Sequence, residues 1–159
     1  MLSIRKAKMD DLKLYFSWAN DPEVRKHSYE STPIEINHHK KWFKSVLNND
    51  LFHLYIFENK NGEKVGQVRI QKESNLEALI GISISSTHRG KGYAKEMLTL
   101  ATDTFFMNNQ DYLINAYIKK ANLKSKFAFE NAGFNLCNII SYKNYTIFHL
   151  LKTSKDENR

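Results

Sequence analysis

The sequence predicts an α/β domain in which a mixed sheet carries helices on both faces. Three observations support this fold class. Apolar runs bounded by turn residues indicate about seven strands, apolar residues at 3- and 4-residue spacing indicate four helices, and the order is strand, two helices, three strands, helix, strand, helix, two strands. With 159 residues, 42% of them hydrophobic, the chain can bury one core, so we expect a single domain over residues 1–151.

The expected N-terminal elements are a strand over residues 3–7, a helix over residues 9–20 and a second helix from Pro33 to about Asn48. An Asp-Pro pair ends the first helix, because proline interrupts helical hydrogen bonding. Thr32 is expected to cap the second helix, with Pro33 at its first position and Glu35 as the reciprocal capping residue. The stretch between the two helices is polar and is expected to be irregular.

The remaining expected elements are strands over residues 51–58, 64–71 and 76–85, a helix after Lys91, a strand over residues 112–118, a helix over residues 122–131, and strands over residues 135–141 and 145–151. Gly62 lies in the turn of the first hairpin, and Gly133 ends the last helix. The helix after Lys91 has the clearest apolar stripe, formed by Ala94, Met97, Leu98, Ala101 and Phe105. Residues 152–159 are expected to be a flexible tail.

Apolar run length, cysteine and histidine content and net charge limit the classes of protein and of partner that we expect. No apolar run is long enough to cross a membrane and the first strand starts near Leu2, so we expect a cytoplasmic protein without a signal peptide. Cys137 is the only cysteine and the six histidines lack ligand spacing, so no disulfide framework or metal site is expected. A formal charge of +7 favours an anionic partner: nucleic acid, acidic lipid or a phosphorylated small molecule.

A glycine-containing turn between a strand and a helix is the most informative segment. Gly90 and Gly92 let an anion approach the free N–H groups at the start of the helix. A Walker A loop is excluded, because its first glycine would fall at Ser85 and the serine or threonine after its lysine would fall at Gly92. A dinucleotide-binding loop starting at Gly90 is excluded as well, because its third glycine would fall at Lys95.

Two motifs resemble the GNAT superfamily of N-acetyltransferases. The segment Arg89, Gly90, Lys91, Gly92, Tyr93 and Ala94 resembles the loop that binds the pyrophosphate of acetyl-CoA, and residues 122–134 resemble the later Asn-x-x-Ser and Gly-Phe signature. The resemblance implies a mostly antiparallel sheet of about seven strands that separates between strands four and five to admit the pantetheine arm. It makes acetyl-CoA the co-substrate, contacted also by Ile82, Ser83, Ile84, Asn122 and Ser125. A metal is not implied.

The resemblance also directs attention to acid and base groups. Glu77 is the candidate base that accepts a proton from the attacking amine, although a solvated carboxylate at a strand end explains it as well. Many relatives have a tyrosine acid where this chain has Phe129, which cannot donate a proton. Tyr142 and Tyr145 are candidate substitutes, as is Tyr117, and for each of them a packing role is the alternative.

The acceptor side is expected near the first two helices. Its pattern resembles, more loosely, the branch that acetylates nucleotide-linked amino sugars, and the candidate acceptor residues are Trp18, Asn20, Arg25, Tyr29 and Trp42. Cations suit a diphosphate and flat rings suit a base or sugar, whereas packing between helices explains the tryptophans equally well. Rival functions are protein N-terminal acetylation and a non-catalytic module that binds CoA or nucleic acid. The expected partner is a small-molecule amine; nucleic acid and membranes are disfavoured, and a homodimer is allowed.

Overall fold

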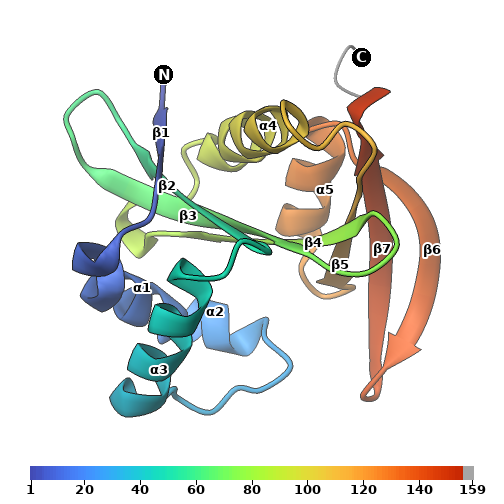
Figure 1. Cartoon of the computed structure of the whole chain (residues 1–159). Coiled ribbons are helices and arrows are strands. Elements are labelled where there is room, and N and C mark those ends of the chain that lie inside the picture. The colour runs from blue at the N-terminus through green and yellow to red at the C-terminus, as the bar shows by residue number, and fades with distance from the viewer. Residues whose placement is uncertain (156–159) are drawn as a thin grey trace.

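The computed structural model describes residues 1–155, in which seven strands and five α-helices alternate with two short 3-10 turns (Figure 1). The strands are β1 (Ser3–Lys6), β2 (Phe52–Glu58), β3 (Lys64–Lys72), β4 (Glu77–Ile84), β5 (Leu113–Lys119), β6 (Asn135–Tyr142) and β7 (Tyr145–Thr153). The helices are α1 (Leu12–Ala19), α2 (Pro22–Lys26), α3 (Ile36–Leu47), α4 (Tyr93–Phe106) and α5 (Leu123–Asn131), and the 3-10 turns are η1 (Met9–Asp11) and η2 (Ser86–His88).

All strands form one sheet in the order β1-β2-β3-β4-β5-β7-β6. Every neighbouring pair is antiparallel except β4 and β5, which are parallel. The parallel pairing covers only Glu77 to Leu79 on β4 and Leu113 to Asn115 on β5. The predicted mixed sheet, with its separation between strands four and five, is therefore confirmed.

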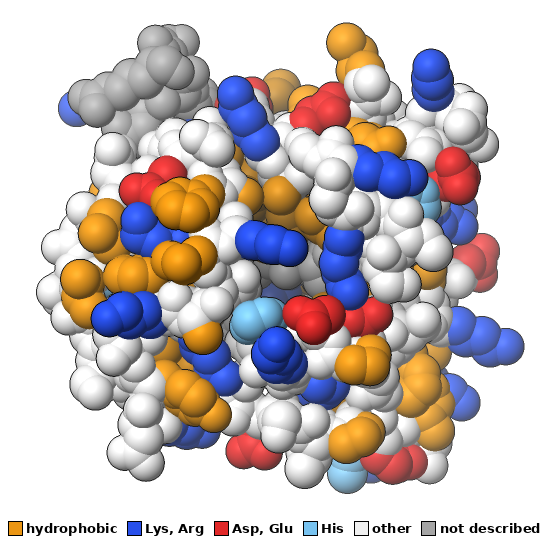
Figure 2. Space-filling view, turned by 180° about the vertical axis from the view of Figure 1, so that it is seen from behind, with side chains coloured by type: hydrophobic (Ala, Val, Ile, Leu, Met, Phe, Trp, Pro, Cys, Tyr) orange, Lys and Arg blue, Asp and Glu red, His pale blue; other side chains and the backbone are white. Residues whose placement is uncertain are grey.

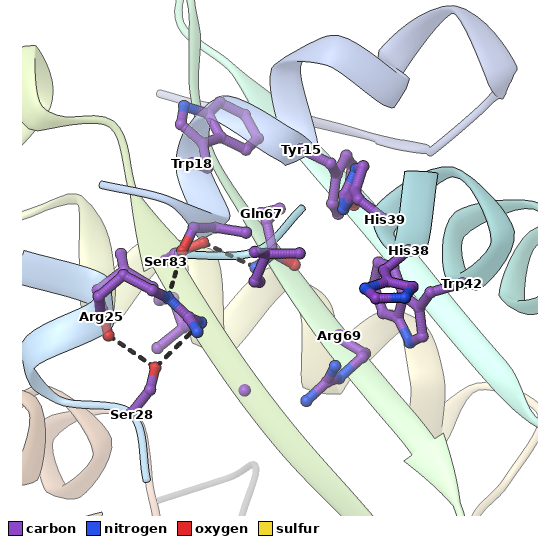
Figure 3. Close-up of a pocket in the computed structure, with 15 residues that line it drawn as sticks. Tyr15, Trp18, Arg25, Ser28, His38, His39, Trp42, Gln67, Arg69 and Ser83 are labelled. Atoms are coloured by element: carbon purple, nitrogen blue, oxygen red, sulfur yellow. Dashed lines mark hydrogen bonds between the residues drawn. The ribbon is translucent and has the colours of Figure 1, made fainter. Parts of the chain in front are cut away.

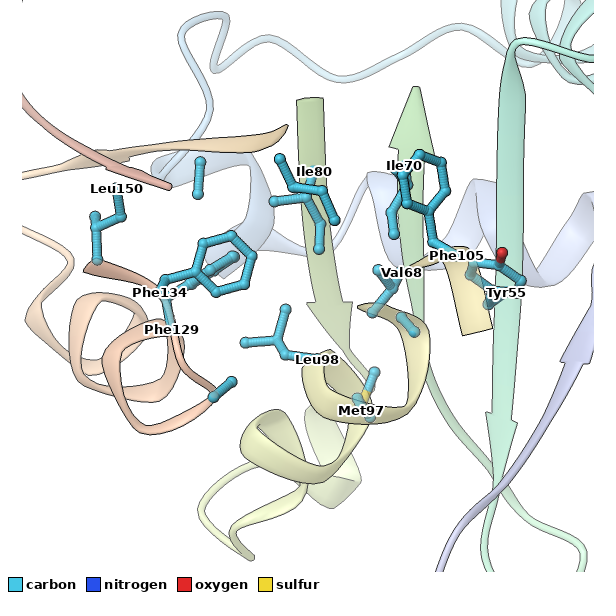
Figure 4. Packing of buried hydrophobic residues seen from close by; sticks show 14 of the residues in the cluster. Tyr55, Val68, Ile70, Ile80, Met97, Leu98, Phe105, Phe129, Phe134 and Leu150 are labelled. Atoms are coloured by element: carbon cyan, nitrogen blue, oxygen red, sulfur yellow. The ribbon is translucent and has the colours of Figure 1, made fainter. Parts of the chain in front are cut away.

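Helices cover both faces of the sheet (Figure 1). On one face α4 and α5 pack over the strands, and Met97 and Leu98 of α4 contact the core of Val68, Ile70 and Ile80 (Figure 4). On the other face α1 and α3 cover β2 through a second apolar cluster, made of Tyr15, Trp18, Phe43, Val46, Leu54 and Ile56. We call this second side of the sheet the cavity face.

The start of α3 differs from the sequence expectation. Its N-cap is Glu35, whose carboxylate accepts hydrogen bonds from the N–H groups of residues 37 and 38 at 3.1 and 3.3 Å. Thr32 and Pro33 lie outside the helix, so the predicted cap at Thr32 is wrong. The side chain of Asn20 explains this shift, because its amide binds both the N–H and the C=O of Ile34, at 2.6 and 2.9 Å, and holds that backbone before the helix begins.

Two other boundaries also differ. The Asp-Pro pair that ends α1 also starts the short helix α2, where Asp21 caps the N–H of Glu23 at 3.0 Å and Pro22 occupies the first position. At the other end, β7 continues through Thr153, and Lys152 is 2% exposed. The expected tail therefore does not begin at Lys152, and residues 156–159 of it lie outside the described residues. No helix in the described range is long and apolar enough to cross a membrane.

Candidate active site

The separation of β4 from β5 opens a cleft in the middle of the sheet. Beyond Leu79 and Asn115 the two strands have no paired residues, so the β5-facing backbone groups of the second half of β4 have no strand partner. Alternation along β4 directs Ala78 and Ile80 into the core, and Gly81 and Ser83 toward the cavity face. An extended ligand arm can therefore pair with the outer half of β4.

The loop after β4 forms an anion site at the start of α4. Gly90 and Gly92 adopt left-handed backbone conformations, with φ of 75° and 79°, and Gly92 is the N-cap of the helix. The first N–H groups of α4, which begins at Tyr93, have no acceptor within the helix. These free donors, together with the positive end of the α4 dipole, fit the phosphates of acetyl-CoA.

The side chain of Arg89 reaches from this loop to the acceptor side. Its Nη2 atom donates to Asp21 Oδ1 at 2.7 Å, and Asp21 is the cap of α2. Burial opposes ionisation of Asp21, but the hydrogen bond from Arg89 and the backbone donor of Glu23 outweigh it, so the pKa of Asp21 is lowered. One ion pair thus joins the loop before α4, residues 89–92, which we call the phosphate loop, to the helix α2.

The second motif has structural roles on the far side of the cleft. Asn122 caps α5, and its side chain accepts from the N–H of Ser125 at 3.4 Å. Phe129 is 3% exposed and packs against Phe134 with ring centroids 5.0 Å apart. The position where relatives place a tyrosine is therefore part of the core here.

A cavity of about 430 Å³ lies on the cavity face beside β4 (Figure 3). Its walls come from α1, α2, α3, β3 and β4, and the lining residues are Tyr15, Trp18, Ala19, Val24, Arg25, Ser28, Ile34, His38, His39, Trp42, Gln67, Arg69, Gly81, Ile82 and Ser83. Among the residues the structure describes, no aspartate or glutamate lines it. A neutral or anionic group suits this cavity better than a cluster of ammonium groups.

The candidate acceptor residues divide into two groups. Trp18, Arg25 and Trp42 line the cavity, although three donor atoms of the Arg25 guanidinium bind Ala19 O, Glu30 O and Ser28 Oγ. Asn20 is not in the lining, because its amide holds the backbone of Ile34.

Tyr29, Tyr142 and Tyr145 lie together around one buried lysine. Lys119 is 8% exposed; its Nζ atom lies 3.8 Å from the ring centre of Tyr145 and donates to Ser28 O at 2.7 Å. Tyr29 contacts Tyr142 with ring centroids 5.0 Å apart. These contacts fasten the loop after α2 to the closing hairpin, next to the mouth of the cavity.

Glu77 lies at the closed end of the cleft and does not line the cavity. Its Oε1 atom accepts from Asn115 Nδ2 at 2.9 Å, Asn115 Oδ1 lies 2.7 Å from His149 Nε2, and His149 Nδ1 lies 3.2 Å from Cys137 Sγ. Burial lowers the pKa of His149, partly offset by Glu77, so its ring is neutral at pH 7. The ring therefore donates from Nε2 and accepts at Nδ1, and the chain of contacts orients Glu77.

Sequence reasoning missed Arg69, Gln67, Tyr15 and the two histidines of the cavity. Alternation along β3 carried a signal, since Gln67 and Arg69 occupy the face opposite to Val68 and Ile70. A cation on the inner face of a central strand is unusual and points to a ligand. Groups of three or more potential metal ligands are not found in the described part of the chain.

Comparison with known proteins identifies the family. A family model described as an acetyltransferase (GNAT) domain matches residues 1–135. The chain belongs to the GNAT acetyltransferase family. The glycine loop before α4 and the open β4–β5 cleft fit acetyl-CoA as the co-substrate, which confirms the expectation of an acetyl-CoA-dependent acetyltransferase domain. Viewed from behind, Lys and Arg side chains gather around a central hollow, as expected for a domain that binds anions (Figure 2).

Solved GNAT structures match the whole fold at low identity. The spermidine N-acetyltransferase of Vibrio cholerae, in complex with CoA and spermine, has a TM-score of 0.89 and 17% identity, with 99% of this chain and 98% of that chain covered. An aminoglycoside acetyltransferase in complex with coenzyme A and kanamycin has a TM-score of 0.83 and 16% identity, with 100% and 98% covered. These likenesses establish the fold and leave the acceptor open.

A sequence relative is an uncharacterized protein of Methanocaldococcus jannaschii, 28% identical over 134 residues that make up 82% of this chain and 27% of the relative. This GNAT chain thus spans about a quarter of the length of that relative.

Proposed function

We propose that the protein transfers an acetyl group from acetyl-CoA to a primary amine of a nucleotide-linked amino sugar. The observation that carries this proposal is the cavity beside β4, which has two tryptophans and an arginine pair in its lining and no carboxylate among the described residues. Flat rings bind sugar and base faces, and guanidinium groups bind phosphate. A polyamine would need acidic partners that this lining does not supply.

Different elements around the cleft bind the coenzyme and the acceptor. The loop amides before α4 hold phosphates, and the outer half of β4 pairs with the coenzyme arm. Acetyl-CoA, when bound, supplies an acetyl thioester that an amine attacks directly. Residues on α1 and α3 hold the sugar so that the amine faces β4.

An ammonium must lose its proton before it attacks, because amines of ordinary pKa are protonated at pH 7. Glu77 is the proposed acceptor of that proton, and it acts through water because it lies outside the cavity lining. Asn115 fixes the orientation of its carboxylate. The departing thiol needs no acid, since a thiol pKa of about 8.5 makes its anion a tolerable leaving group.

Parallel assays of thiol release test the proposal. Wild-type protein with acetyl-CoA is offered UDP-linked amino sugars, a ribosomal-protein N-terminal peptide and spermidine at equal concentration. We expect the highest kcat/KM with a UDP-amino sugar and a large loss of kcat with little change of KM in Glu77→Gln. A preference for the peptide would replace the proposed acceptor, and absence of thiol release with every amine would contradict the enzymatic function.

A further inference from the structure

The side chain of Arg69 is the least compensated charge in the cavity. It projects from β3 into the open space between α1, α3 and β4, and no dashed contact reaches it in Figure 3. Throughout residues 1–155, its guanidinium has no hydrogen bond or ion pair. Partial burial lowers the pKa of Arg69, and the charge of Tyr15 offsets this only in part.

Two further polar atoms beside Arg69 lack partners. Tyr15 is 4% exposed, and its hydroxyl makes no hydrogen bond. Gln67 donates from Nε2 to Ser83 Oγ at 2.7 Å, while its Oε1 atom has no partner. Buried polar groups are normally paired, so two unpartnered buried atoms beside the half-buried, unpaired guanidinium of Arg69 indicate a ligand that pairs with them.

Neighbouring carboxylates do not neutralise this arginine. Asp11, the acidic residue close to Tyr15, is held by both terminal nitrogens of Arg5 at 2.8 and 2.9 Å. Glu77 is bound by Asn115 and lies outside the lining. The remaining charged or titratable groups in the lining are Arg25, His38 and His39, none of them acidic. The missing partner of Arg69 is therefore an anion from outside the chain.

The guanidinium of Arg69 lies well away from the phosphate loop. The Nη2 atom of Arg69 lies 3.7 Å from the position of a side chain on Gly81, so the guanidinium rests against the middle of β4. Gly81 precedes the loop amides at Arg89 by eight residues, and the extended part of that distance alone, to Ile84, is roughly 10 Å. Coenzyme phosphates held at α4 therefore do not reach Arg69.

We propose that Arg69 binds an anionic group, a phosphate or a carboxylate, that the acceptor itself carries. The Tyr15 hydroxyl supplies a second donor to the same anion. This inference rests on the proposed acetyl transfer and narrows its acceptor to an amine that also bears a negative charge. Arg69 is then the residue that selects such acceptors against neutral amines and polyamines.

Calorimetric titration tests this selection without turnover. With CoA at saturating concentration to fill the phosphate loop, UDP, glucuronate and spermidine are titrated into wild type, Arg69→Gln and the charge-matched surface control Lys44→Gln. We expect UDP or glucuronate to bind wild type and Lys44→Gln equally, and to bind Arg69→Gln about 10- to 100-fold more weakly. Which of the two anions binds more tightly identifies phosphate or carboxylate as the source.

Two results would overturn the inference: neither anion binds wild type, or Arg69→Gln binds both anions as tightly as wild type does. Arg69→Lys guards against a folding defect, because it keeps the charge and loses the planar fork; we expect intermediate affinity. Failure of CoA to bind would instead contradict the proposed function, and the anion titrations would still report on Arg69.

Discussion

At the scale of single residues, the backbone of Gly92 shows how directly one φ angle can serve a binding site. Its φ of 79° is accessible to glycine at little cost, and it lets the chain turn from the loop into the first residue of α4. No protein atom lies within 4 Å of where a side chain would start, so that space is available to a ligand. A side chain added here obstructs the phosphate and leaves the core unchanged.

We therefore expect Gly92→Val to raise the KM for acetyl-CoA tenfold or more. Gly62→Val is a matched control, because Gly62 has a φ of 77° and equally open surroundings in the β2–β3 turn. Both variants should lose similar thermal stability through backbone strain, while only Gly92→Val loses coenzyme affinity. Steady-state kinetics together with thermal melts separate the two effects, and an unchanged KM would show that the loop is only a turn.

At the residue scale, the sequence predicts a site most directly where all of its residues lie in one contiguous segment. The loop from Arg89 to Ala94 is contiguous, so its spacing alone indicated an anion site. The residues that line the cavity with Arg69, and the hydrogen-bond partner of Glu77, come from strands and helices far apart in the chain, and no local pattern could bring them together. Whether Glu77 accepts the proton remains the prediction that the Glu77→Gln kinetics test.

At the scale of elements, a distant contact explains why the start of helix α3 was predicted wrongly. Thr32, Pro33 and Glu35 form one capping pattern that predicts a start at Thr32, whereas Glu35 is the cap in the structure. The later start is set by Asn20, which binds the backbone of Ile34 from 14 residues away. The positions of the strands along the chain, in contrast, followed from apolar alternation and from turns within a few residues.

Paired substitutions test which signal caps α3. We expect Glu35→Ala to lower Tm, because it removes the acceptor for two N–H groups in the first turn. Thr32→Ala should leave Tm nearly unchanged, since Thr32 lies outside the helix and makes no hydrogen bond that shapes it. A larger drop in Tm for Thr32→Ala than for Glu35→Ala in differential scanning calorimetry would show that Thr32 is the cap, as the sequence predicts.

At the scale of the whole molecule, two buried or partly buried carboxylates join different elements, and one of them does so across 68 residues of sequence. Asp11 ties η1 to Arg5 of β1, and Asp21 ties α2 to Arg89 of the phosphate loop. Burial of Asp11 opposes ionisation, but the hydrogen bonds from Arg5 and the Lys8 amide prevail, so its pKa falls below 3.8. The pKa of Asp21 is lowered in the same direction.

The lowered pKa values of Asp11 and Asp21 determine the direction in which stability changes as the pH falls. A carboxyl whose folded pKa is depressed stabilises the fold fully above the unfolded value of 3.8, and this contribution disappears as pH falls through the lower folded pKa. The double variant Asp11→Asn with Asp21→Asn should be less stable at pH 7 and lose less stability between pH 5 and pH 3. Urea unfolding across this range measures both, with Asp103→Asn, an exposed carboxylate, as control. Equal acid slopes in all variants would disprove this assignment.

The ion pair between Arg89 and Asp21 gives the molecule an internal competitor for coenzyme phosphate. Drawing Arg89 away from Asp21 costs the free energy of this ion pair, and Asp21 also caps α2, the helix that forms one wall of the cavity. Thermodynamic linkage is reciprocal, so under the proposed function an acceptor that changes coenzyme affinity through this ion pair has its own affinity changed by the same factor. One guanidinium thereby joins the loop before α4 to the wall of the proposed acceptor cavity.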